Sequence, residues 1–109
     1  MTQYILVPAV LLLYMRDNLH RPFGAEQVAD GIGISRSKLD KACSARFGQS
    51  LGKEILAARL RKAKSLLKEG RFNIDEIAHV TGFGTSAYFI KKFKAATGMT
   101  PRKWRVSTD

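Results

Sequence analysis

The strongest constraint on the fold is an internal repeat. The 109-residue chain carries the pattern Ala-x-x-x-Gly-apolar twice, at residues 29–34 and 78–83. Two copies are too few for a solenoid, so the repeat predicts two small helical units, each with a helix, a glycine turn and a second helix. Further along the chain the two copies are offset by one more residue, so the second copy has one extra residue after its turn. The later matched pairs are Leu39 with Phe89, Lys41 with Lys91, Gly48 with Gly98, and Ser50 with Thr100.

Composition and charge limit the class of protein. Hydrophobic residues make up 45% of the chain, which indicates a packed core, and the net charge is +10. A strongly basic chain favours a polyanionic partner, because Lys and Arg neutralise phosphates and release counterions; charge alone also leaves a membrane surface or an acidic protein open. The single cysteine, Cys43, excludes an intramolecular disulfide and suits a reducing cytoplasm. The last quarter of the chain is rich in basic residues, and its only acidic residue is Asp109. These basic residues are Lys91, Lys92, Lys94, Arg102, Lys103 and Arg105.

Residues 4–15 form an apolar run interrupted by Pro8. The run is shorter than the ~20 residues that span a bilayer. It also lacks the preceding positive charge and the cleavage site of a signal peptide. Because proline suits the first turn of a helix, we expect residues 1–7 to be a linker and residues 8–18 to form a buried helix.

Caps and apolar spacing predict the other helices. A short helix follows Gly24, and longer ones cover residues 35–46, 51–69 and 74–81. Another begins after Thr85 and ends before Gly98, and a last short one begins at Pro101. No window alternates with the period of a strand, so the fold class is all-α. The domains are a first helix-turn-helix unit at 8–50, a linker helix at 51–70, a second unit at 71–106 and a tail at 107–109. The residues expected to face inward are Val28, Ala29, Leu39, Cys43, Leu51, Ile55, Ala58 or Arg59, Ala63, Leu66, Leu67, Tyr88, Phe89, Phe93 and Ala96.

Residues 73–105 carry the most specific motif. They contain an Ile-Ala pair at 77–78, Gly82-Phe83, Tyr88-Phe89, Phe93-Lys94, and then Gly-x-Thr-Pro-x-x-aromatic-Arg at 98–105. This pattern resembles the signature of the AraC/XylS family of bacterial transcription regulators, and the likeness covers about residues 8–105. Residues 7–10 and 34–37 also resemble the xylose-operon-regulator branch. The resemblance implies two homeodomain-like helix-turn-helix units joined by a rigid helix and bound to double-stranded DNA.

The length of the linker helix is compatible with this function. Nineteen residues span roughly 28 Å at ~1.5 Å per residue, and successive major-groove segments on one face of DNA lie ~34 Å apart. Helices 35–46 and 86–97 would each read one segment through their outer faces, at positions that match those the family uses. The candidate base contacts are Arg36, Ser37, Asp40, Lys41, Ser86, Ala87, Ile90 and Lys91. The candidate phosphate contacts, which set register without reading sequence, are Ser35, Lys38, Thr85, Lys92, Lys94, Arg102, Lys103 and Arg105.

Ile90 departs from the small polar residue that the family commonly has at this position. On a recognition helix it would pack on thymine methyl groups, so we expect it to favour thymine in the second segment. Lys41 and Lys91 would donate to guanine, and Asp40 would accept from cytosine.

No enzyme, cofactor or metal site is expected, because no nucleophile and base are grouped and His20 and His79 are isolated. A cysteine-dependent repair enzyme is a distant alternative. The resemblance implies that regulators of this kind usually activate transcription by touching RNA polymerase in the bacterial cytoplasm, at the nucleoid when bound to DNA. We expect the chain to be the C-terminal part of a larger protein that binds its small-molecule effector through another domain. The alternatives are a stand-alone regulator and a non-specific architectural protein that coats nucleic acid.

Overall fold

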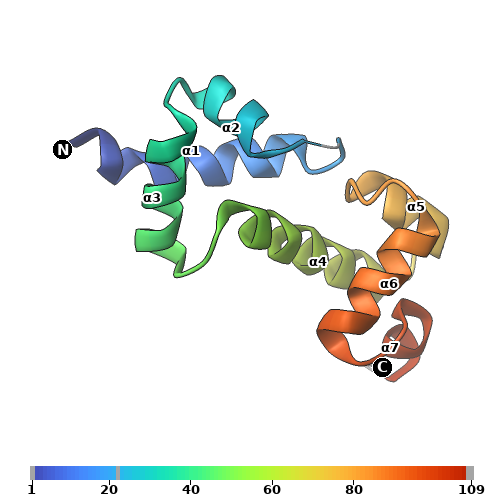
Figure 1. Cartoon of the computed structure of the whole chain (residues 1–109). Helices are drawn as coiled ribbons and strands as arrows, with labels where there is room; N and C mark the ends of the chain where they lie inside the picture. Colours follow the sequence, from blue (N-terminus) through green and yellow to red (C-terminus); the bar gives the residue numbers. More distant parts are fainter. Residues whose placement is uncertain (1, 22, 108–109) are drawn as a thin grey trace. The chain divides into compact units, whose positions relative to one another are not determined.

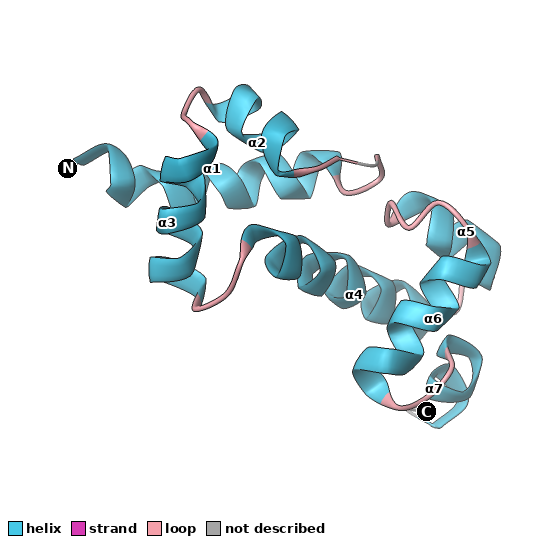
Figure 2. Ribbon diagram, viewed as in Figure 1, coloured by secondary structure: helices cyan, strands magenta, loops and turns pink. Residues whose placement is uncertain are grey.

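The computed structural model describes residues 2–21 and 23–107, with side chains from Ala9 onwards. This part of the chain contains helices and loops and no strands, as the sequence predicts (Figure 2). No helix in it is both long and apolar enough to cross a membrane. Figure 1 shows the helices in chain order: α1 (Thr2–Asn18), α2 (Ala25–Ile32), α3 (Arg36–Phe47), α4 (Leu51–Glu69), α5 (Ile74–Val80), α6 (Ser86–Thr97) and α7 (Pro101–Ser107).

The chain divides into two compact units. The first holds residues 1–18 and 23–58, and the second holds residues 19–22 and 59–109. Helix α4 therefore begins in the first unit and ends in the second. The short connector after α1 belongs to the second unit, although the helices on either side of it belong to the first.

The first unit is built from α1, α2, α3 and the start of α4. Its core contains Leu11 and Met15 of α1, Val28 of α2, Leu39 of α3 and Leu51 of α4, all at most 2% exposed. Leu11 and Met15 lie four residues apart, which places them on one face of α1. The apolar faces of α1, α2, α3 and the start of α4 thus bury one another.

Helix α1 differs from its prediction in two ways. It begins at Thr2 rather than at Pro8, so Pro8 lies past the first turn of the helix, where proline removes a backbone donor and is disfavoured. It is also buried on one face only: Val10, Leu12 and Leu13 are 40–51% exposed. The predicted start at residue 8 is therefore wrong, and the predicted burial holds for the face with Leu11 and Met15 but not for the opposite face.

The second unit has an aromatic core. Phe89 and Phe93 of α6 are fully buried, with ring centroids 5.7 Å apart, and Phe93 also meets Trp104 of α7 at 5.8 Å. Both contacts are edge-to-face, the arrangement that aromatic rings prefer. Phe83, from the turn, completes the cluster at 5.0 Å from Phe89.

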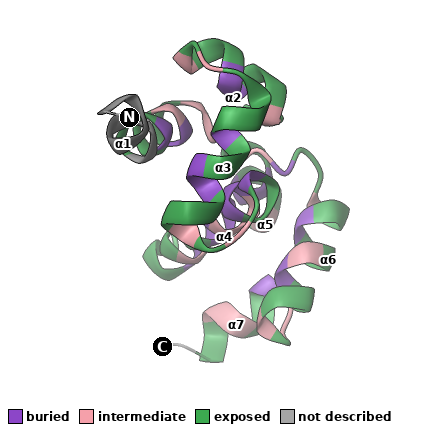
Figure 3. Cartoon of the chain, turned by 60° about the vertical axis from the view of Figure 1, so that its left-hand side comes forward, coloured by how far each residue is buried: buried purple, intermediate pink, exposed green. Residues whose placement is uncertain are grey.

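Buried and exposed positions alternate along the helices in the way that amphipathic spacing requires (Figure 3). The inner stripe predicted for α4 is confirmed, including both Ala58 and Arg59 at the position left open. In α6, Tyr88 and Ala96 are exposed instead of buried. Tyr88 lies one residue, about 100° of helix rotation, from the buried Phe89, and Ala96 lies in the last turn of the helix.

Candidate nucleic-acid interface

Helix α3 begins at the cap that the sequence predicts. The Ser35 hydroxyl accepts from the Lys38 backbone N–H at 3.2 Å, after a turn in which Gly33 adopts a left-handed φ of 77°. Leu39, Ala42 and Cys43 face the core. The four predicted base contacts are all exposed on the other faces of the helix: Arg36, Ser37, Asp40 and Lys41.

Two of these four residues already pair with each other. The Arg36 Nε lies 3.4 Å from the Asp40 carboxylate, one helical turn away, and its Nη1 lies 4.0 Å from Glu26 of α2. All three side chains are at least half exposed, so each ion pair is weak and readily exchanged for another partner. The contacts hold the Arg36 guanidinium along the exposed face of α3.

Helix α6 repeats this design with different side chains. Thr85 caps it by accepting from the Tyr88 N–H at 3.2 Å, and Phe89 and Phe93 face the core. Ala87, Ile90 and Lys91 are exposed and Ser86 is half-buried. Helices α3 and α6 therefore present chemically different exposed faces after equivalent caps.

The second turn requires glycine at position 82. Gly82 has a φ of 83°, and a β-carbon there would overlap the Arg59 guanidinium and the Leu19 carbonyl oxygen. The extra residue predicted from the repeat spacing is accommodated in the same turn, where Gly84 is also left-handed, with a φ of 89°. Thr85 then begins the cap of α6.

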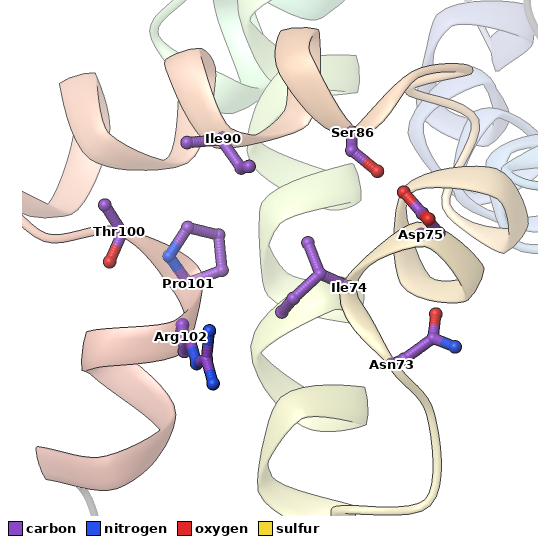
Figure 4. A pocket seen from close by; sticks show the side chains of 8 residues that line it. All are labelled: Asn73, Ile74, Asp75, Ser86, Ile90, Thr100, Pro101 and Arg102. Atoms are coloured by element: carbon purple, nitrogen blue, oxygen red, sulfur yellow. The ribbon is translucent and has the colours of Figure 1, made fainter.

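A groove of about 620 Å³ lies beside α6 (Figure 4). Ile90 lines it together with Ile74 of α5 and Pro101 of α7, which gives it an apolar wall. The Ser86 Oγ is buried and has no hydrogen-bond partner among the described residues. The full lining is Asn73, Ile74, Asp75, Ser86, Ile90, Thr100, Pro101 and Arg102.

Most of the predicted phosphate contacts are exposed, but Lys92 and Arg105 are half-buried. The Lys92 ammonium lies 5.6 Å from the centre of the Tyr88 ring. Arg105 differs, because its guanidinium donates to the Leu67 carbonyl at 3.1 Å and to the Phe72 carbonyl at 2.5 Å. These bonds tie α7 to the end of α4 and the loop that follows it. The exposed group is Ser35, Lys38, Thr85, Lys94, Arg102 and Lys103.

Arg59 has a role that the sequence analysis did not identify. Its side chain is 6% exposed and donates to the backbone carbonyls of Leu19, Arg21 and Thr81. Burial lowers the pKa of its guanidinium, but arginine stays protonated in proteins. The signal was a basic residue on the inner stripe of α4, where an uncharged residue is the rule.

Cys43 lies in the core of the first unit, 1% exposed. Burial, and then the carboxylates of Asp40 and Glu54, raise the pKa of its thiol to about 11. A thiol of this kind is mostly protonated at neutral pH and therefore a poor nucleophile.

Comparison with known proteins places this geometry among DNA-binding domains. A family profile described as "Helix-turn-helix domain" matches residues 28–107. The chain is 36% identical over 100 residues to the xylose operon regulatory protein of Escherichia coli, a match that covers 90% of this chain and 26% of the relative.

Solved structures of transcription regulators share this fold. The C-terminal domain of AraT, a response regulator from Geobacillus stearothermophilus, superimposes with a TM-score of 0.85 at 27% identity, covering 94% of this chain and 84% of that one. An AraC-type transcriptional regulator from Chromobacterium violaceum gives 0.81 at 26% identity, covering 90% and 88%. The chain thus spans about a quarter of the length of the xylose operon regulatory protein but most of these two solved chains.

Proposed function

Because the chain belongs to the AraC/XylS family of helix-turn-helix transcription regulators, we propose that it reads two major-groove segments of double-stranded DNA, one with α3 and one with α6. The observation that carries this proposal is the pair of capped recognition helices whose exposed faces differ. Arg36, Asp40 and Lys41 are exposed on α3, whereas Ile90 and Lys91 are exposed on α6. A protein that only coats DNA needs positive charge but not two different reading faces.

Each reading face offers contacts that distinguish bases. Lys41 and Lys91 donate to the O6 and N7 of guanine, and Asp40 accepts from the N4 amine of cytosine. Arg36 reaches guanine once it exchanges its surface ion pairs for the base. Ser37, Ser86 and Ala87 complete the two faces as small side chains that allow close approach.

Ile90 gives the second segment an apolar contact. It is 36% exposed and lines the groove together with Ile74 and Pro101. Its exposed methyl groups are therefore available to a thymine methyl. The second DNA segment therefore favours thymine opposite Ile90.

Phosphate contacts supply the part of the affinity that does not depend on sequence. The proposed cations lie on α3, on α6 and on α7: Lys38, Lys92, Lys94, Arg102 and Lys103. Each phosphate that they neutralise releases counterions. The hydroxyls of Ser35 and Thr85 and the backbone donors beside them, at the starts of α3 and α6, are oriented to bind phosphate oxygens. Arg105 contributes to the fold rather than to this group.

We assign the chain to the C-terminal part of a larger regulator that acts in the bacterial cytoplasm. The 26% coverage of the xylose operon regulatory protein supports this over a stand-alone regulator. In that larger protein a separate domain binds the effector. The DNA-bound regulator then activates transcription by contact with RNA polymerase, as the family resemblance implies.

The test is selection from a random-sequence duplex pool at physiological salt, followed by sequencing. Two enriched segments about one helical turn, ~10.5 bp, apart are the expected result. Enrichment of one segment would refute reading by both helices. Binding that falls steeply with salt and enriches no sequence would replace the proposal with a non-specific architectural protein.

A further inference from the structure

The first turns of α6 expose methyl groups rather than hydrogen-bonding groups. Ala87 and Ile90 are both exposed and lie on one face of the helix, because residues at i and i+3 are neighbours on its surface. Ser86 lies one turn before Ile90, and its Oγ is buried. Among the described residues of this face, none between Thr85 and Lys91 exposes a side-chain donor or acceptor. The face therefore offers apolar contact to DNA.

The groove beside α6 extends this apolar surface. Ile74 of α5, Ile90 of α6 and Pro101 of α7 line one hollow of about 620 Å³ (Figure 4), and all three helices belong to the second unit. The charged side chains that line it have opposite signs, Asp75 and Arg102. A methyl group that approaches Ile90 therefore meets apolar surface and open space, and either a donor or an acceptor can lie beside that methyl group.

The chemical group that such a face recognises is a methyl group rather than a whole base. In the major groove, thymine presents its C5 methyl group beside the O4 acceptor. 5-Methylcytosine presents a methyl group at the same ring position, beside the N4 amine. A side chain that contacts only the methyl group, such as Ile90, does not distinguish these two bases, whereas a side chain that donates to O4 would.

The equivalent position of the first unit has the opposite chemistry. The repeat that pairs Lys41 with Lys91 also pairs Asp40 with Ile90. The Asp40 carboxylate is half exposed and lies 3.4 Å from the Arg36 guanidinium. Contact with a methyl group would remove this carboxylate from water without providing a hydrogen bond, which is unfavourable. We therefore expect only α6 to gain from a methyl group on the DNA.

We propose that α6 recognises the C5 methyl group of a pyrimidine in the second DNA segment, so that the chain binds a site with 5-methylcytosine at that position more tightly than the same site with cytosine. This inference rests on the proposed two-segment reading. Ile90 makes the contact, and methylation of cytosine in the second segment thereby regulates binding. Methylation of cytosine in the first segment does not raise the affinity.

The experiment starts from the site that the duplex selection gives and changes single bases in it. Each thymine of the second segment is replaced in turn by uracil, which lacks only the methyl group, and affinities are compared by fluorescence anisotropy. One replacement should lower the affinity roughly fourfold, the value of one buried methyl group. At that position cytosine is then compared with 5-methylcytosine, and the methyl group should raise the affinity by the same factor. These comparisons use the unchanged chain, so they do not depend on the folding of a variant.

Two controls connect the effect to Ile90. Ile90→Ser should remove both differences, whereas Val106→Ser, at an exposed position of α7, should keep them. The second control is the first DNA segment, in which replacement of any cytosine by 5-methylcytosine should not raise the affinity. A gain in the first segment that equals the gain in the second would refute the assignment to α6.

The outcomes distinguish this inference from the function on which it rests. If the selection enriches no second segment, both proposals fail. If a second segment is enriched but contains no thymine that uracil weakens, or if 5-methylcytosine binds no better than cytosine, the two-segment function is retained and methyl recognition is refuted. Methyl recognition by Ile90 is also refuted if Ile90→Ser keeps the methyl preference, because another side chain then makes the contact.

Discussion

Arg102 precedes Trp104 in the sequence of α7 and Arg105 follows it. We nevertheless expect the loss of each arginine to have a different consequence. Arg102 is exposed beside the groove next to α6, whereas the Arg105 guanidinium donates to the carbonyls of Leu67 and Phe72. We therefore predict that Arg102→Gln weakens DNA binding without destabilising the fold. Arg105→Gln should destabilise the fold with little effect on the salt dependence of binding.

The magnitudes follow from the contacts. Loss of one phosphate contact lowers the steepness of the fall of log K with log salt by ~0.9, which is roughly a fivefold loss of affinity at 0.15 M salt. Hydrogen bonds to a charged group contribute ~1.5–3 kcal/mol when buried. For the half-buried Arg105 we expect about 2 kcal/mol for the pair, or a fall in Tm of about 10 °C in a domain of this size.

Fluorescence anisotropy with a labelled duplex over a range of KCl concentrations gives the slope, and circular dichroism gives the Tm. The reasoning is refuted if Arg105→Gln lowers the slope by as much as Arg102→Gln at an unchanged Tm. It is also refuted if Arg102→Gln melts about 10 °C lower with an unchanged slope.

Three further predictions concern single side chains. Ile90→Ser should remove the preference for thymine in the second segment while Val106→Ser, at a 72% exposed position, should not; an unchanged preference in the selection would rule out the methyl contact. Phe93→Ala should lower the free energy of unfolding in urea by ~3–5 kcal/mol, because it empties a fully buried site. Tyr88 is 48% exposed, so the control Tyr88→Ala should lower it by less than ~1.5 kcal/mol. Cys43 should react with iodoacetamide at pH 8 about 100-fold more slowly in the folded than in the unfolded chain, since raising its pKa from 9.0 to about 11 leaves about 100-fold less thiolate; equal rates would refute a buried thiol.

Local signals in the sequence predict most of the fold. Ser35, Asn73 and Thr85 each cap the helix that follows, and Gly48 and Gly98 end α3 and α6 in the left-handed conformation. These features depend on a few neighbouring residues, so they are readable without knowledge of tertiary contacts. The start of α1 was missed because proline is permitted at a helix start but does not require one.

The roles of the arginines are less accessible from sequence. Arg102 is exposed to solvent, whereas Arg59 donates to a buried backbone carbonyl and Arg105 donates to a carbonyl at the end of α4. Each role depends on which backbone carbonyls the fold brings within reach, and these lie 22 to 40 residues away in sequence. The charge pattern of the sequence identifies the arginines as a group but does not distinguish those that bind backbone carbonyls from those that are exposed.

The edge-to-face contact between Phe93 and Trp104 also makes one unit optically visible. Trp104 is the only tryptophan of the chain, and the first unit has none. Its emission therefore follows the aromatic core of the second unit, whereas the far-ultraviolet dichroism follows the helices of both. Coincident transitions by the two signals mean that the halves unfold as one cooperative system, and separate transitions mean that each duplicated half is a folding unit of its own.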